Sequence, residues 1–315
     1  IGRNFCNKIW NAGRFILMKN DELNNLENQN GTIQYELSLA DKWILSRFNS
    51  TINILQESLD NFKVTDYAKV LYDFIWRDFC DWYIEIFKIQ SNLNNDFLYR
   101  SGLNNFVLSL YDGILKLIHP VMPFISEEIW HLINNKDESE SISLQDNPKS
   151  DNSKIDAKIE SDFELLQLVI EEVRKLRAGS NIPPSKKLPI TLSVKNEIEL
   201  ELFNNTSRII ANLGRAESLN IAKNAAKPDV SISSVVRDVE IFVEVGSAID
   251  IEQEKARLMK EVARLEGNIM GSEKKLSNEK FVQNASPQIV QSEREKLESM
   301  KSSLEKVKEN LRDLG

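Results

Sequence analysis

Two stretches near the end of the sequence decide its C-terminal fold, IEQEKARLMKEVARLEGNIMGSEKKL (Ile251–Leu276) and IVQSEREKLESMKSSLEKVKENLRDL (Ile289–Leu314). Each carries apolar residues at steps of three, four and seven, which is the spacing of a coiled-coil seam. The seam positions are Ile251, Leu258, Val262, Leu265, Ile269 and Leu276 in the first stretch, and Ile289, Leu297, Met300, Leu304, Val307, Leu311 and Leu314 in the second.

The two seams predict their own register if the chain reverses near Phe281–Pro287. The expected pairs are Leu276 with Ile289, Ile269 with Leu297, Leu265 with Met300, Val262 with Leu304, Leu258 with Val307 and Ile251 with Leu314. The residue numbers of every pair sum to 565 or 566, and an antiparallel pair requires a constant sum. Lys255 falls opposite Leu311, where its aliphatic stem can cover the seam. We therefore expect an antiparallel hairpin roughly 40 Å long.

Upstream of the hairpin, residues 1–133 predict a helical bundle. Apolar residues recur every third or fourth position over about 3–18, 39–59, 65–90, 97–118 and 123–133. Breaks are expected at Asn30-Gly31, Asp60-Asn61, Asn94-Asn95 and His119-Pro120. Residues 134–158 are rich in Asn, Asp, Ser and Lys, and they predict a surface loop with a short strand at Ile142 and Leu144.

Residues 160–248 predict a small α/β subdomain. A helix is expected over Asp162–Arg177, and the two prolines within Asn181–Lys187 exclude both helix and sheet interior. Strands are expected at Ile190–Val194, Ser218–Ile221 and Val239–Val245, with a helix over 197–213. The predicted organisation is mainly α, with a bundle over 1–159, a small α/β subdomain over 160–248 and a coiled-coil arm over 249–315.

Composition limits the function classes. The 315 residues carry 40 basic and 48 acidic side chains, so the net charge of −8 argues against coating nucleic acid by bulk charge. Residues 1–19 nevertheless hold four basic residues and no acidic one, whereas 251–315 hold 13 basic and 12 acidic residues. Two cysteines without a Cys-x-x-Cys pair offer no disulfide framework or zinc site, which favours the cytoplasm. No uncharged run exceeds twelve residues, so no membrane segment is expected.

No catalytic constellation is found in the sequence. The only histidines, His119 and His131, lie in no nucleophile, metal or phosphate motif, and His119 is interpreted as a helix-terminal residue. Glu127-Glu128 after Ser126 is interpreted as a helix start rather than as an acid/base pair. Because the chain begins at Ile1 with a helical pattern already running at Phe5, we expect it to be cut from a longer parent.

The first helix has two distinct faces on a helical wheel. Phe5, Ile9, Ala12 and Ile16 share one side, and Arg3, Asn7, Trp10, Asn11 and Arg14 share the other. Guanidiniums bind phosphates, amides pair with base edges, and an indole stacks on an unpaired base. This face is a candidate RNA surface. The alternative is that Trp10 packs against a neighbouring helix and the arginines pair with acids.

Five separated motifs carry a family resemblance. They are GRNFCNKIWNAGRF (Gly2–Phe15), LADKWILSR (Leu39–Arg47), FCDWY (Phe79–Tyr83), HPVMPFISEEIW (His119–Trp130) and NIPPSK (Asn181–Lys186). The first four resemble the anticodon-binding region of class I aminoacyl-tRNA synthetases. The fifth, together with KLSNEKFV (Lys275–Val282) and Glu293-Arg294, is similar to valyl-tRNA synthetases in particular. The family's Ala-Pro at the arm tip is replaced here by Ala285-Ser286-Pro287.

The resemblance implies that the parent joins valine to tRNA(Val) with ATP and Mg²⁺ on an upstream domain. Neither the HIGH nor the KMSKS signature of that class occurs here, so we expect a non-catalytic fragment without cofactor or metal. The expected partner is tRNA(Val), not DNA or a membrane, and the expected state is a monomer. By resemblance the bundle holds the anticodon stem-loop, through Arg3, Asn7, Lys8, Trp10, Asn11 and Arg14.

By the same resemblance the arm lies along the outer corner of the tRNA. Lys274, Lys275, Lys280 and Arg294 cluster near its tip and are the candidate phosphate contacts. The alternative for these residues is a solvated helix face. For the whole chain, the alternative is a structural scaffold whose coiled coil docks other proteins.

Overall fold

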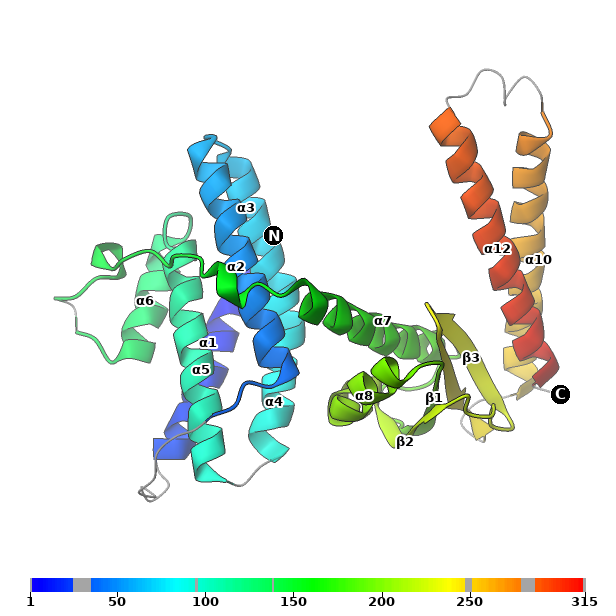
Figure 1. Cartoon of the computed structure of the whole chain (residues 1–315), viewed down its shortest axis with the longest axis horizontal. Coiled ribbons are helices and arrows are strands. Elements are labelled where there is room, and N and C mark those ends of the chain that lie inside the picture. Colours follow the sequence, from blue (N-terminus) through cyan, green and yellow to red (C-terminus); the bar gives the residue numbers. More distant parts are fainter. Residues whose placement is uncertain are drawn as a thin grey trace. The chain divides into compact units, whose positions relative to one another are not determined.

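A computed structural model describes residues 2–24, 35–93, 96–137, 139–246, 251–278 and 287–313 (Figure 1). The contacts divide the chain into two compact units, Ile1–Glu164 and Leu165–Gly315, each with its own core. Helices dominate both units, which confirms the mainly α fold class. The finer division into three domains stays a prediction.

The first unit is a bundle of helices whose apolar faces meet in one core. The predicted helices are all present, with ends shifted by a few residues. Their bounds are α1 (Gly2–Asn24), α2 (Leu39–Asp60), α3 (Val64–Asp73), α4 (Ile84–Leu93), α5 (Phe97–Ile118) and α6 (Pro123–Asn134). Between α3 and α4 the chain continues as a π-helix, η1 (Phe74–Tyr83). The single helix expected over 65–90 is therefore wrong in its middle, because the FCDWY motif forms the wider π turn.

A buried carboxylate organises the start of α2. Asp41 is fully buried and completes a capping box with Ser38, whose backbone N–H and hydroxyl donate to Asp41 Oδ2 at 2.8 and 2.6 Å. The hydroxyls of Tyr35 and Tyr83 each donate to the same carboxylate at 2.6 Å. Burial, followed by the Asp41 charge, raises the pKa of Tyr83 well above its usual value. Asp41 thus joins three segments of the bundle.

A glycine lets α1 lie close to its neighbours. A Cβ added at Gly13 would stand 3.0 Å from Ile129 Cγ2 and 3.1 Å from Tyr111 Cε1. The buried Tyr111 hydroxyl donates to the carbonyl of Ile9 at 2.7 Å. The glycine of the first motif therefore serves helix packing, which fixes α1 against α5 and α6.

The strand expected at Ile142 and Leu144 is wrong. Residues 142–144 form a 3-10 turn, η2 (Ile142–Leu144), and a second turn follows at η3 (Asn152–Lys154). Ser141 and Asp151 cap the two turns through bonds to Ser143 N and Ser153 N. The described residues of this stretch contain no strand. Ile142 is buried and Leu144 is exposed. Two apolar residues separated by one polar residue therefore occur here in a turn, although the same spacing is typical of a strand.

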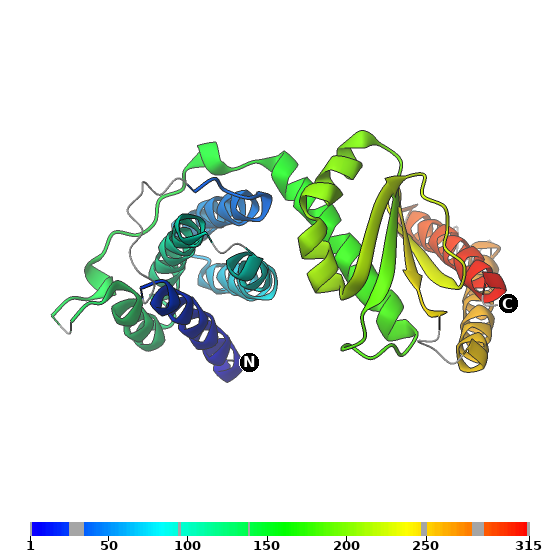
Figure 2. The ribbon, with the colours of Figure 1, turned by 90° about the horizontal axis from the view of Figure 1, so that it is seen from below.

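The second unit combines the end of α7 (Ala157–Gly179) with a four-stranded mixed sheet. The elements are β1 (Leu188–Val194), α8 (Glu197–Asn205), α9 (Ser207–Gly214), β2 (Ala216–Lys223), β3 (Ser231–Val236) and β4 (Val239–Glu244). The strand order is β2-β1-β4-β3, with β1 and β2 parallel and the other pairs antiparallel. Helices α8 and α9 pack on the sheet beside α7 (Figure 2).

In this unit one predicted helix is wrong, and one strand is present that was not predicted. The helix expected over 197–213 is broken at Thr206, whose hydroxyl donates to the Leu202 carbonyl at 2.8 Å and whose own carbonyl starts α9. Strand β3 was not predicted. Its serines dilute the apolar alternation, and its pairing depends on a hairpin with β4 whose turn places Arg237 at a φ of 51°.

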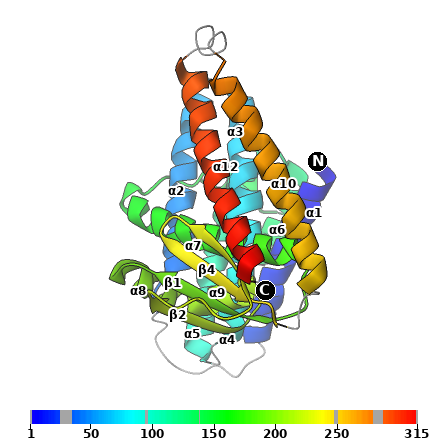
Figure 3. The same cartoon turned by 90° about the vertical axis from the view of Figure 1, so that its right-hand side faces the viewer.

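The coiled coil forms as expected from α10 (Ile251–Leu276) and α12 (Pro287–Asp313), which lie side by side in Figure 3. Leu258, Leu265 and Ile269 are buried in its seam. The pairing of Leu276 with Ile289 is wrong, since Ile289 is 55% exposed and Val290 only 8%. Val290 lies seven residues before Leu297, so it continues the heptad and keeps the sum at 566. The Ile251–Leu314 pair and the tip, residues 279–286, lie outside the described side chains.

A polar layer interrupts this apolar seam. The hydroxyl of Ser272 donates to Glu293 Oε1 at 2.8 Å, and the two residue numbers again sum to 565. That bond is the main reason why the pKa of Glu293 is below its usual value, and Lys275 adds a smaller effect. The apolar spacing of the two helices does not reveal this layer, because neither Ser272 nor Glu293 is apolar.

The base of the arm is fastened to the sheet through Asn310. Its side-chain oxygen accepts from the Ser233 backbone N–H at 3.1 Å and from the Ser233 hydroxyl at 2.8 Å. Its amide nitrogen donates to the Ser233 carbonyl at 3.2 Å. Helix α12 is thus bonded to β3 at the edge of the sheet.

Candidate nucleic-acid interface

The two faces of α1 are those that the helical wheel predicts. Because the core takes one side, the opposite side must face solvent. Buried residues are Phe5, Ile9, Ala12 and Ile16, and exposed residues are Arg3, Asn7, Trp10, Asn11 and Arg14. The exposed set is called the α1 face below.

The α1 face combines charge, amides and one aromatic ring. Trp10 is 38% exposed, so its indole is not absorbed into the core. Within the described part of the chain, Arg3 and Arg14 make no ion pair with an acidic residue. Among the described residues, the arginines thus do not pair with acids as the alternative interpretation expects, and whether Trp10 serves RNA binding or packing against a neighbouring helix stays a prediction.

Lys8 differs from the other candidates on α1. Its ammonium forms an ion pair with Asp81 and lies 3.7 Å from the centre of the Trp76 ring. Trp76 stacks in turn on Tyr72, with ring centroids 5.5 Å apart. Lys8 is thus engaged within the bundle. The half-buried Trp76 beside it is an aromatic neighbour that sequence spacing could not identify, because it lies on η1.

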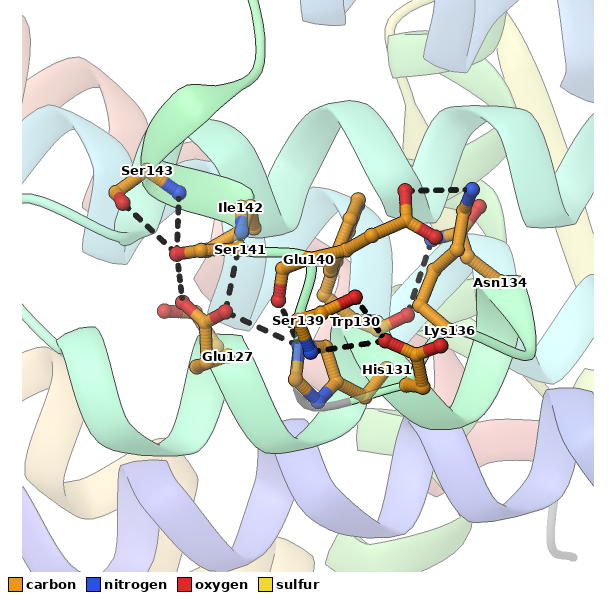
Figure 4. Close-up of polar contacts among 12 residues, drawn as sticks. Glu127, Trp130, His131, Asn134, Lys136, Ser139, Glu140, Ser141, Ile142 and Ser143 are labelled. Atoms are coloured by element: carbon orange, nitrogen blue, oxygen red, sulfur yellow. Dashed lines mark hydrogen bonds and ion pairs between the residues drawn. The ribbon is translucent and has the colours of Figure 1, made fainter.

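The two histidines converge on one carboxylate. His131 Nε2 lies 3.2 Å from Glu127 Oε1 and 2.8 Å from the Glu140 carbonyl. Figure 4 draws His131 between Glu127 and Glu140. His119 Nδ1 lies 3.9 Å from Glu127 Oε2. Glu127 also accepts the Ile142 backbone N–H at 3.1 Å. The carboxylate therefore fastens the loop after α6 to that helix. Helix α6 begins at Pro123, so the interpretation of Glu127-Glu128 after Ser126 as the helix start is wrong.

This cluster contains no nucleophile in position to react. Ser126, the hydroxyl closest to His119 at 2.9 Å, is fully buried and donates to the Met122 carbonyl at 2.8 Å. We interpret the cluster as structural, because its contacts hold the loop after α6 against that helix.

The arm carries three of its four candidate contacts in described positions. Lys274, Lys275 and Arg294 are exposed, and Lys275 Nζ lies 3.6 Å from a Glu293 oxygen. Lys280 lies outside the described residues. The end of α10 and the start of α12 thus present basic side chains, of which Lys275 is partly neutralised.

The described ranges contain neither a metal-binding cluster nor a membrane-spanning helix. In 2–24, 35–93, 96–137, 139–246, 251–278 and 287–313 no group of three or more His, Cys, Asp or Glu could hold a metal ion. None of the helices in those ranges is both long and apolar enough to cross a bilayer.

Comparison with known proteins separates the chain into two matched regions. Residues 41–192 match the anticodon-binding domain of tRNA ligases, and residues 250–315 match the valyl-tRNA synthetase tRNA-binding arm. Residues 193–249, which include α8, α9 and most of the sheet, lie between the two matches.

Two curated relatives align over nearly the whole chain. The valine–tRNA ligase of Chlorobaculum tepidum is 36% identical over 324 residues, covering 100% of this chain and 36% of the relative. The valine–tRNA ligase of Thermosynechococcus vestitus is 35% identical over 318 residues, covering 99% of this chain and 34% of the relative. The chain thus spans about a third of the length of these relatives.

A helical bundle with an anticodon-binding sequence, followed by a coiled-coil arm, defines the C-terminal region of a class I aminoacyl-tRNA synthetase. Within this class, the match of the arm and the alignments over nearly the whole of this chain indicate the enzymes that are specific for valine. The chain belongs to the valine–tRNA ligase family.

Proposed function

We propose that this chain recognises tRNA(Val) for a valine–tRNA ligase whose catalytic and editing domains lie outside these residues. Helix α1 and its neighbours receive the anticodon stem-loop, and the arm braces the outer corner of the tRNA. ATP and Mg²⁺ act on the catalytic domain, so the chain itself uses no cofactor. It works in the cytoplasm as a monomer and does not carry out aminoacylation alone.

The observation that supports this proposal most directly is the α1 face. An anticodon loop offers phosphates and unpaired bases at short range. Arg3 and Arg14 are exposed cations for phosphates, and Asn7 and Asn11 are amides for base edges. Trp10 lies between them with an accessible ring. A surface that binds only the sugar-phosphate backbone of the RNA would need the charged side chains but not the amides and the indole.

The arm contributes differently. Its 13 basic and 12 acidic residues nearly cancel, so a few phosphate contacts near Lys274 and Arg294 and the shape of the hairpin carry its share of binding. Because each phosphate contact releases about one counterion, we expect a modest salt dependence from the arm.

Binding of tRNA to the purified chain tests the proposal. Titration with tRNA(Val) and with a tRNA of another anticodon should show tighter binding of tRNA(Val). Equal and weak binding of both would contradict specific recognition. Dimerisation through the arm in light scattering, without any shift of tRNA in a gel, would favour the scaffold alternative. Pyrophosphate exchange with ATP and valine should stay at background.

Replacing Trp10 with alanine should weaken tRNA(Val) binding by about 1–3 kcal/mol, because a stacked base loses its aromatic partner. Fluorescence anisotropy with labelled tRNA measures this loss. Met18→Ala is the matched control, since Met18 is an exposed apolar residue of the same helix at 46% exposure. Equal affinities for wild type and a folded Trp10→Ala chain would remove the indole from the interface.

A further inference from the structure

The second unit contains a basic cavity that shares no residue with the α1 face or with the candidate contacts of the arm. Its volume is about 600 Å³, within the range of small-ligand pockets. It lies where the last turns of α7, the proline-rich loop and the end of α9 meet. The lining residues are Arg174, Arg177, Ala178, Asn181, Ile182, Pro183, Pro184, Leu213, Gly214 and Arg215.

One buried guanidinium holds the walls of this cavity together. Arg177 is only 5% exposed, and its guanidinium donates to the carbonyls of Pro183 at 3.4 Å, Lys186, and Arg215 at 3.5 Å. These bonds tie the proline-rich loop to the junction of α9 and β2. The cavity is therefore built before any ligand arrives, which lowers the cost of binding.

The charged side chains that line the cavity are basic. Three of the lining residues are arginines, and among the described residues no aspartate or glutamate lines the cavity. Arg174 and Arg215 are exposed, and the Arg174 Nε donates to the Leu213 carbonyl at 3.1 Å, which holds that side chain at the cavity wall. Burial, followed by the charge of Arg215, lowers the pKa of Arg177. Clustered guanidiniums repel one another, and an anion between them would relieve that repulsion.

Part of the lining is apolar. Ile182, Pro183, Pro184 and Leu213 supply it, and the prolines are exposed. A cationic rim beside an apolar wall matches a nucleotide, which carries a phosphate at one end and a flat ring at the other. An acidic peptide would satisfy the guanidiniums but would leave the proline surface without a partner.

We propose that this cavity binds one nucleotide unit of RNA, with the phosphate held by Arg174 and Arg215 and the base against Pro183 and Pro184. This site is additional to the α1 face and the arm tip, and it rests on the proposed function because the RNA is the bound tRNA. Lys186 and Lys187, exposed on the same loop, extend the basic surface toward neighbouring phosphates.

A double variant of the full chain tests the site without touching Arg177. Arg174→Gln and Arg215→Asn remove two charges, and asparagine tolerates the positive φ of 58° at position 215. The matched control is Arg208→Gln with Arg237→Asn, which removes two arginines of the same unit. Arg208 is exposed in the first turn of α9, and Arg237 has a φ of 51°.

The double variant should bind tRNA(Val) about tenfold more weakly than wild type and reduce the salt slope by about one to two. The control should keep the wild-type affinity and slope. Unchanged binding by the double variant, or equal losses in both variants, would overturn the cavity site and leave the proposed function standing. A wild-type chain that binds no tRNA would overturn both.

A competition experiment distinguishes binding of RNA in the cavity from binding of free phosphate or a mononucleotide. Millimolar inorganic phosphate or AMP, added at constant ionic strength, should leave tRNA binding unchanged, because the rest of the tRNA holds the nucleotide at high effective concentration. AMP that weakens wild-type binding to the level of the double variant, without affecting that variant, would make the cavity a free-nucleotide site. The proposal would then be wrong about the source of the phosphate.

Discussion

Replacing Asp41 with alanine is expected to lower the free energy of unfolding of the first unit by about 3–5 kcal/mol. The change leaves the hydroxyls of Tyr35, Ser38 and Tyr83 without their acceptor, and buried polar groups without partners are costly. The midpoint of thermal unfolding should fall by roughly 6–20 °C for a unit of this size.

Tryptophan fluorescence measures this transition selectively, because all five tryptophans, at positions 10, 43, 76, 82 and 130, belong to the first unit. Asp21→Ala is the control, since Asp21 is an exposed aspartate on α1. A midpoint within one degree or so of wild type in Asp41→Ala would show that the network contributes little to stability.

Replacing Leu265 with aspartate should unfold the arm locally. Leu265 is buried in the seam, and truncation of a buried leucine alone costs about 2–5 kcal/mol, to which burial of a charge adds. Hydrogen exchange of the α10 and α12 amides should accelerate by about a thousandfold, which corresponds to about 4 kcal/mol. Tryptophan fluorescence of the first unit should not change.

Met259→Asp controls for the added charge, because Met259 is exposed on the same helix. If both variants keep the protection of wild type, the two helices do not depend on this seam for stability. If Leu265→Asp unfolds the arm and tRNA(Val) binding is unaffected, the arm has no part in affinity.

Long amphipathic elements were predictable because their burial follows local periodicity. The α1 face could be derived from a wheel, since one side of a helix packed against α5 and α6 leaves the other in solvent. A coiled-coil register could be predicted because each pair constrains every other pair, and the bond between Ser272 and Glu293 fits the predicted sum. Among the described seam residues, Ile289 is assigned wrongly, at a position where two adjacent apolar residues compete for one heptad site.

The remaining features depend on contacts that no local pattern contains. Strand β3 exists because β4 pairs with it, and the break at Thr206 follows from a buried hydroxyl that bonds backward to Leu202. The convergence of His119 and His131 on Glu127 requires the folded loop. The basic cavity could not be predicted, since Arg177 and Arg215 are 38 positions apart and meet only when the end of α7 reaches the junction of α9 and β2.

The layer of Ser272 and Glu293 fixes the reach of the arm. A slip of one heptad would keep most apolar pairs, yet it would place the Glu293 carboxylate against Leu265 and remove its hydroxyl partner. Such a slip would move one helix along the other by about 10 Å. By making that alternative unfavourable, one serine and one glutamate set how far from the sheet the basic end of α10 lies.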